Sequence, residues 1–208
     1  MLLLLLAISS LTDHVVSDAP DPSACSYEIT MESNSNGETE LMTIRYDQET
    51  DELEAFDADG EKIESERDGD DSEKPMMGFP TYADVAEKLD LPWRATDNPA
   101  IYIAADLPKG SADMGGVDLS KNALLTLRLA DEASPTFVES YRAELTKPQR
   151  VKMVAKLKRF EQETEFAVVQ GWPRPVRWQM AGEVSALGKA QDFSMLATYQ
   201  YGACADAR

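Results

Sequence analysis

The only two cysteines of this 208-residue chain, Cys25 and Cys204, lie near its opposite ends. An even pair of cysteines is typical of proteins that fold in an oxidising compartment, because the reducing cytosol seldom uses structural disulfides. We therefore expect a Cys25–Cys204 disulfide that holds the two ends together. Closing a loop of this length would stabilise the fold by up to about 5 kcal/mol in the chain-entropy model.

An apolar segment precedes the first cysteine, with Leu2 to Leu6 at its start and Leu11 near its end. It is too short to span a bilayer and has the length of a signal-peptide core, so it predicts no transmembrane segment. We expect residues 1–19 to be a leader for export to the periplasm or the extracellular space, cleaved after Ser17 or Ala19. The first basic residue is only Arg45, which is atypical of such a leader, and a buried N-terminal segment is the alternative.

A lipid-anchored N-terminus is a weaker alternative. Ser23-Ala24-Cys25 resembles the end of a lipoprotein acylation box, but Pro22 stands where that box usually has leucine. A catalytic Cys25 is weaker still, because no histidine is available in the predicted mature chain to activate the thiol.

Composition predicts a single domain over residues 20–208, because 43% of the chain is hydrophobic and the length allows a sizeable core. The net charge is −18 and unevenly spread. Residues 26–90 hold 21 acidic and 5 basic side chains, whereas residues 137–190 hold 6 acidic and 10 basic ones. Such a chain would repel nucleic acid. The asymmetry indicates either two halves that attract each other or a field that steers a partner.

The N-terminal third has the alternation of β-strands. Tyr27, Ile29 and Met31 alternate with polar residues, and Leu41 to Tyr46 form a second candidate strand. A hairpin is predicted where Asp59-Gly60 separates residues 53–57 from residues 61–64, since glycine accepts the positive φ of such a turn. The following charged run, residues 64–74, predicts a solvated loop.

Two helices are expected. The first begins at Thr81, whose spacing to Asp84 suits an N-terminal cap, and ends before Pro92. The second covers residues 147–165, because Thr146 and Gln149 form a capping box and Met153, Leu157 and Phe160 form an apolar stripe. A strand remains the alternative for this second segment, since its apolar residues also alternate with lysines from position 151 to 157.

The C-terminal region contains the strongest hairpin signal, with apolar residues alternating over 178–186 and 193–201 around Gly188-Lys189. Residues 124–129 and 137–145 are further candidate strands, although Ser134-Pro135 could instead open a helix. Together these segments predict an α+β fold: one mainly antiparallel sheet of about six to eight strands with two packed helices.

The sequence offers little catalytic chemistry. Its only histidine is His14 in the expected leader, so it contains neither a Ser-His-Asp relay nor a histidine-containing zinc site. It also lacks glycine fingerprints for nucleotides, and we expect no cofactor and no metal. Residues 55–66 approach an EF-hand register, but Ala55 occupies the first ligand position and the hairpin explains the same residues.

The candidate binding residues are Trp172, Arg174, Arg177 and Trp178. Pro173 and Pro175 predict an extended edge or loop that enters the final hairpin, and tryptophan and arginine on such a frame can clamp a ligand. The alternative is that Trp178 belongs to the core and the arginines pair with the acidic half.

These observations favour an exported, non-catalytic binding protein for an apolar small molecule or a protein partner. Binding would use the open sheet face or the segment from Trp172 to Trp178. Two other classes stay open: a hydrolase with a carboxylate pair, one of them of raised pKa in a cleft, and a structural or assembly factor of the cell envelope.

Overall fold

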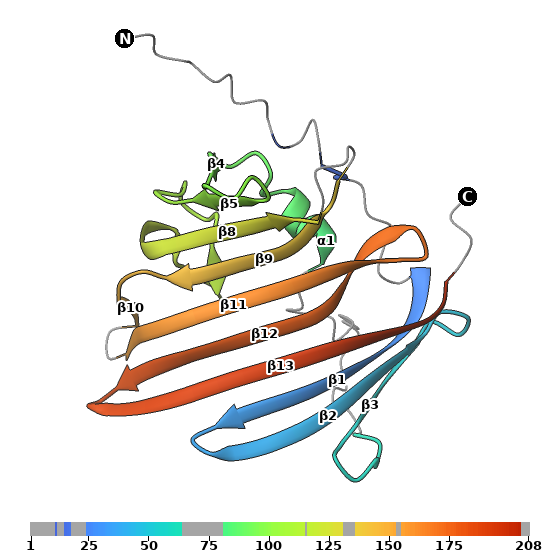
Figure 1. The fold of residues 1–208 in the computed structure, drawn as a ribbon. Coiled ribbons are helices and arrows are strands. Elements are labelled where there is room, and N and C mark those ends of the chain that lie inside the picture. Colours follow the sequence, from blue (N-terminus) through green and yellow to red (C-terminus); the bar gives the residue numbers. More distant parts are fainter. Residues whose placement is uncertain are drawn as a thin grey trace, which may run out of the picture.

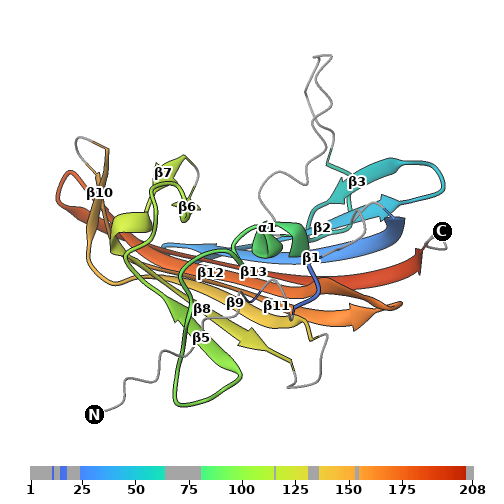
Figure 2. The same ribbon diagram turned by 90° about the horizontal axis from the view of Figure 1, so that it is seen from above.

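The computed structural model describes residues 11, 15–17, 24–63, 81–114, 116–130, 136–152 and 155–204. In this part of the chain one large antiparallel sheet dominates, and it is twisted and bent (Figures 1 and 2). The strands of this sheet follow the order β3-β2-β1-β13-β12-β11-β9-β8-β5-β4, and β10 pairs with β11. Strands β6 and β7 form a separate two-stranded ribbon.

The strands have the following bounds: β1 (Cys25–Ser35), β2 (Glu38–Asp47), β3 (Glu52–Phe56), β4 (Arg94–Ala95), β5 (Ile101–Ala104), β6 (Asp113–Met114), β7 (Val117–Asp118), β8 (Ala123–Leu129), β9 (Val138–Leu145), β10 (Gln149–Lys152), β11 (Ala155–Val169), β12 (Trp172–Ala186) and β13 (Lys189–Cys204). The helical elements are α1 (Tyr82–Ala86) and the 3₁₀ turn η3 (Ser120–Asn122).

The first and last strands of the chain lie side by side in the sheet. β1 pairs antiparallel with β13, and Cys25 is opposite Cys204 in the register. The two residues form a disulfide across 179 positions of sequence, which confirms the predicted bond. The chain ends are thus joined both by strand pairing and covalently.

The sheet has one apolar and one polar face, because paired residues share a face and neighbours along a strand alternate. One row across eight strands is nearly all apolar: Tyr102, Leu127, Tyr141, Thr164, Trp178, Ala197, Met31 and Met42. The adjacent row is mostly polar: Thr126, Arg142, Glu163, Gln179, Leu196, Glu32 and Leu41.

Helix α1 packs on the apolar face, inside the bend of the sheet (Figure 2). Its N-cap is Thr81, whose side chain accepts from Asp84 N while the Asp84 carboxylate accepts from Thr81 N, as the sequence predicts. Tyr82 stacks edge-on against Phe166 at 5.2 Å between ring centroids. The Tyr82 hydroxyl accepts from the buried Val138 N and donates to Val16 O, so it ties the helix to the sheet.

The predicted fold class is wrong. The α+β fold with six to eight strands and two packed helices is replaced by a nearly all-antiparallel sheet in which α1 is the one α-helix of the described residues. The error lies in residues 147–165, where the expected helix is strands β10 and β11. β11 is hydrogen-bonded to β9 on one side and to β12 on the other, so tertiary pairing outweighs the local helical signal.

A β-bulge explains the misleading helical spacing. The pairing of β11 with β12 shifts between Leu157 and Arg159, which leaves Lys158 as the extra residue. Leu157 and Phe160 therefore lie on the same buried face although they are three positions apart. Apolar residues three positions apart usually indicate a helix, but here they result from a bulge in a β-strand.

The predicted C-terminal hairpin is confirmed as β12 and β13, but its two-residue turn lies at Leu187-Gly188, one residue before the predicted Gly188-Lys189. The predicted turn at Asp59-Gly60 is also present: Gly60 has φ +80° and its N–H donates to Asp57 O. Up to residue 63, the last one described here, an isolated bridge from Phe56 to Lys62 and a hydrogen bond from Ile63 N–H to Ala55 O continue the expected hairpin. The predicted solvated loop at residues 64–74 lies outside the described residues.

The prolines of the Trp172–Trp178 segment are accommodated at the start of β12. Residues 172–175 pair only with β11, since pairing of β12 with β13 begins at Arg177. Proline lacks the N–H that a second neighbouring strand would require. This part of β12 is therefore extended and has a paired neighbour, β11, on one side.

Part of the expected leader packs in the core. Leu11 and Val15 are buried in the cluster that contains α1, and Val15 forms a parallel bridge with Thr136. This packing matches the alternative of a buried N-terminal segment, while residues 1–10, 12–14 and 18–19 lie outside the described part of the chain. In the described residues, no helix is both long and apolar enough to cross a membrane.

Candidate ligand-binding site

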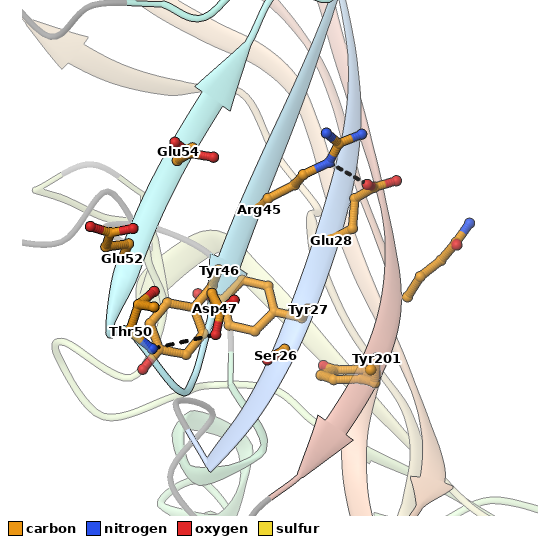
Figure 3. A pocket seen from close by; sticks show the side chains of 12 residues that line it. Ser26, Tyr27, Glu28, Arg45, Tyr46, Asp47, Thr50, Glu52, Glu54 and Tyr201 are labelled. Atoms are coloured by element: carbon orange, nitrogen blue, oxygen red, sulfur yellow. Dashed lines mark hydrogen bonds and ion pairs between the residues drawn. The ribbon is translucent and has the colours of Figure 1, made fainter.

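A cavity of about 510 Å³ lies where β13, β1, β2 and β3 run together at one end of the sheet (Figure 3). Its lining comes from those four strands and the turn between β2 and β3: Ser26, Tyr27, Glu28, Arg45, Tyr46, Asp47, Thr50, Glu52, Glu54, Gln200, Tyr201 and Gly202. The volume falls in the range of pockets that hold small molecules.

Strand pairing gathers acidic side chains at this cavity. Arg45 is opposite Glu28 on β1 and Glu54 on β3, and Asp47 is opposite Glu52. Paired residues share a face, so these five charged side chains lie together on the polar face. Four carboxylates against one guanidinium give the lining a formal charge of −3.

The single cation of the lining is already engaged. Arg45 Nε donates to Glu28 Oε2 at 2.7 Å, as the dashed line in Figure 3 shows. The guanidinium carbon of Arg45 also lies 4.9 Å from the centre of the Phe56 ring. An anionic ligand would have to displace the Glu28 carboxylate to reach Arg45.

The other carboxylates differ in how they are held. Glu54 Oε1 accepts from Lys62 Nζ at 2.7 Å, and Asp47 Oδ1 accepts from the backbone N–H of Glu49 at 2.8 Å. The Glu52 side chain makes no hydrogen bond or ion pair within the described part of the chain, and it is exposed. Glu52 is therefore the carboxylate most available to an incoming cation.

Tyrosines on the opposite face brace this end of the sheet. The Tyr27 and Tyr46 rings stack at 5.1 Å, and Tyr46 Oη donates to Asp51 Oδ1 in the turn after β2. Tyr201 Oη donates to Pro175 O at 2.8 Å, which links β13 to the start of β12. Burial raises the pKa of Tyr201, with the nearby Arg174 guanidinium opposing that rise. The cavity is thus built on a fixed backbone.

The predicted site residues do not come together as one site. Trp178 is buried in a cluster with Ile29, Ile44 and Tyr199. Arg174 is only 5% exposed, and its guanidinium carbon lies 5.6 Å from the centre of the Tyr201 ring. Trp172 is the first residue of β12, lies opposite Val169 at the end of β11, and is half-buried. Whether any of these three residues binds a ligand stays a prediction.

The fourth predicted residue, Arg177, lies on the polar face in a hydrogen-bonded ladder. Its guanidinium donates to Glu165 Oε1 at 2.9 Å and to Gln179 Oε1 at 2.8 Å, and Gln179 in turn donates to Glu163. Arg177 also lines a smaller cavity of about 160 Å³ over the middle of the sheet. Its acidic partner, Glu165, belongs to the basic segment 137–190 and not to the acidic half with which the arginines were expected to pair.

The described residues do not assemble an evident catalytic or metal centre. None of their Asp or Glu side chains is buried, so the interior carboxylate pair of a hydrolase is not found among them. No cluster of metal-ligating side chains occurs in the same residues. In the EF-hand-like segment, Asp57 Oδ1 instead accepts the N–H groups of Asp59 and Glu61.

Comparison of the chain with protein-family models, with curated proteins and with solved structures finds no match. The residues of the cavity carry one sequence signal, since acidic residues alternate with apolar ones on β1 and β3. What the sequence analysis missed is the pairing order, which places β1 between β2 and β13.

Proposed function

We propose that this chain is an exported, non-catalytic binding protein that holds a small cationic ligand in the cavity of Figure 3. The observation that supports a cationic ligand is the negative charge of the lining. It contains four carboxylates and one arginine, which is already paired with Glu28. A ligand with one or more ammonium groups would replace water at Glu52 and Asp47 without breaking the Arg45–Glu28 pair.

The choice of a cation over an apolar ligand follows from where the apolar side chains lie. The apolar residues of β1 and β13, such as Ile29 and Ala197, are buried rather than exposed as an open face. The cavity lies on the polar face instead, where its charged side chains are accessible. The net charge of −18 would also raise the local concentration of cations and speed their association.

Export is supported by the disulfide. A bond between Cys25 and Cys204 would persist in an oxidising compartment and be reduced in the cytosol. A thiol assay on protein taken from its native compartment should find both sulfurs oxidised. Free thiols in that material would remove the support for export and leave the cavity unaffected.

The ligand class is tested by titrating spermidine, a polyamine, into the protein and measuring heat or quenching of tyrosine and tryptophan fluorescence. Wild type should bind, and Glu52→Gln should weaken binding by roughly fivefold, since an exposed ion pair contributes about 1 kcal/mol or less. Binding should weaken with added salt because the charges are exposed.

Glu49→Gln is the matched control. Glu49 lies in the turn next to the cavity, is exposed and does not line it, so the variant changes the net charge identically. Equal weakening in Glu49→Gln and Glu52→Gln would reveal diffuse attraction and contradict the proposal. Loss of binding in Trp172→Ala, with Glu52→Gln unchanged, would move the site to the Trp172–Trp178 segment.

A further inference from the structure

The tip of the β12–β13 hairpin carries an exposed leucine. Leu187 lies in the two-residue turn between β12 and β13, and it is 83% exposed, the highest value among the exposed large apolar side chains of the described residues. Leu41, Ile63 and Val168 are exposed by about half. The hairpin ends at one edge of the molecule (Figure 1).

The backbone at this leucine is strained for its side chain. Leu187 has φ +50° and Gly188 has φ +81°, the left-handed pair of a two-residue hairpin turn. The turn from β1 to β2 has the same pair of angles with Asn36 and Gly37, and asparagine tolerates this conformation well. Leucine cannot form a side-chain hydrogen bond that would offset this strain. Because Leu187 is 83% exposed, its side chain also gains little stabilisation from packing.

Basic side chains surround this tip. The segment 147–159 contains six Lys and Arg residues and no Asp or Glu. Arg150 on β10 is opposite Lys156 on β11, which is opposite Ser185 two residues before the tip, and Lys189 follows the turn directly. The positively charged end of an otherwise acidic chain is therefore the end that presents Leu187.

Most of these cations are not neutralised by the chain. Lys147, Arg150, Lys156 and Lys189 are exposed and form no ion pair within the described residues. Two neighbours do have acidic partners: Lys158 Nζ lies 2.6 Å from Glu183 Oε1, and Arg159 lies 3.8 Å from Asp192. The positive field around the tip is thus available to an external anionic surface.

We infer that the β12–β13 tip docks on an anionic lipid surface, with Leu187 entering the interface and Lys147, Arg150, Lys156 and Lys189 facing the headgroups. A single protruding apolar side chain needs no complementary pocket in a bilayer, and clustered cations bind anionic headgroups. A second copy of the chain is the competing occupant, because its acidic cavity would also attract these cations, and the test below distinguishes the two. The inference does not depend on the proposed ligand.

The test is co-sedimentation of the full chain with vesicles of phosphatidylcholine, alone or mixed equally with phosphatidylglycerol. We expect binding to the mixed vesicles that falls with added salt. Leu187→Asn should lower the partition coefficient at least fivefold while keeping the turn, because asparagine suits the left-handed conformation. Leu41→Thr, a remote exposed leucine replaced on β2, should bind as wild type.

The charges are tested by the double variant Lys156→Gln/Lys189→Gln, which should lower partitioning by roughly fivefold per removed cation. Arg94→Gln/Arg128→Gln removes two exposed cations on β4 and β8, away from the tip, and should have a much smaller effect. The apolar N-terminal segment is common to all variants, so the differences between them report on the tip.

Three outcomes would overturn the inference. The first is an absence of binding to the anionic vesicles, and the second is binding by Leu187→Asn equal to that of wild type. The third is self-association without lipid that Leu187→Asn abolishes, because it would identify a second copy as the partner.

Discussion

Gly182 on β12 and Phe193 on β13 face each other across the hairpin, and a Cβ atom added to Gly182 would lie 2.4 Å from Phe193 Cζ. The same atom would lie 2.8 Å from Arg159 O on the other neighbouring strand. The aromatic ring therefore occupies the space that a side chain at position 182 would fill. Gly182 does not have the positive φ that would call for glycine. The close contacts with Phe193 and Arg159 are therefore what require a residue without a side chain at this position.

We predict that Gly182→Ala destabilises the fold by about 1–3 kcal/mol, the usual cost of overpacking. Urea unfolding followed by tryptophan fluorescence measures the change. Gly202→Ala is the control, since its Cβ would be 3.6 Å from the nearest atoms of Ser26. A loss in Gly202→Ala as large as that in Gly182→Ala would show that strand glycines in general, rather than the Phe193 contact, determine the cost.

Removing the Cys25–Cys204 bond tests how far the joined chain ends contribute to stability. The double variant Cys25→Ser/Cys204→Ser should lose up to about 5 kcal/mol of unfolding free energy, because the unfolded chain regains the entropy of a loop closed across 179 residues. The comparison is urea unfolding of the variant and of wild type with and without reductant. Equal stability of all three samples would contradict a stabilising role for the bond.

Alkaline pH should destabilise the protein through its buried tyrosines. Burial raises the pKa of Tyr82, Tyr141, Tyr199 and Tyr201 above the ordinary value of 10.0. The stability from keeping these hydroxyls protonated is fully present below the unfolded-state pKa of about 10. It is lost as the pH rises through the folded-state pKa values, by on the order of 1.4 kcal/mol per pH unit for each tyrosine.

Urea unfolding at about pH 8 and about pH 11, with absorbance titration of tyrosinate in the folded and unfolded states, checks this expectation. Unfolding of Tyr141→Phe should release about one proton fewer at alkaline pH, so its unfolding free energy should fall less steeply with pH than that of wild type. Tyrosines that titrate near pH 10 in the folded protein would contradict the burial of their hydroxyls.

Local chemistry made several features of the fold predictable from sequence. The Thr81–Asp84 cap, the C-terminal hairpin and the turn at Gly60 each depend on residues close together in the chain. The disulfide followed from cysteine count alone. None of these features depends on which distant strands pair.

The failures come from long-range pairing. Strand β11 carries a helix-like spacing at Leu157 and Phe160 because a bulge at Lys158 interrupts its alternation. The cavity was missed because its carboxylates become neighbours only in the register that pairs β2 with β1 on one side and with β3 on the other. The predicted binding residues were chosen for their chemistry along one segment, but alternation and a second register shift near Arg177 separate Trp178 from Arg177 in the folded sheet.

Backbone amide chemical shifts in a spermidine titration of the isotope-labelled protein map most directly where a cation binds. If the cation occupies the cavity of Figure 3, the shifted amides should cluster at Ser26, Glu28, Arg45 and the segment from Asp47 to Glu54, with Gln200 beside them. Shifts concentrated at Trp172 to Trp178, or scattered over all acidic residues of the surface, would contradict it.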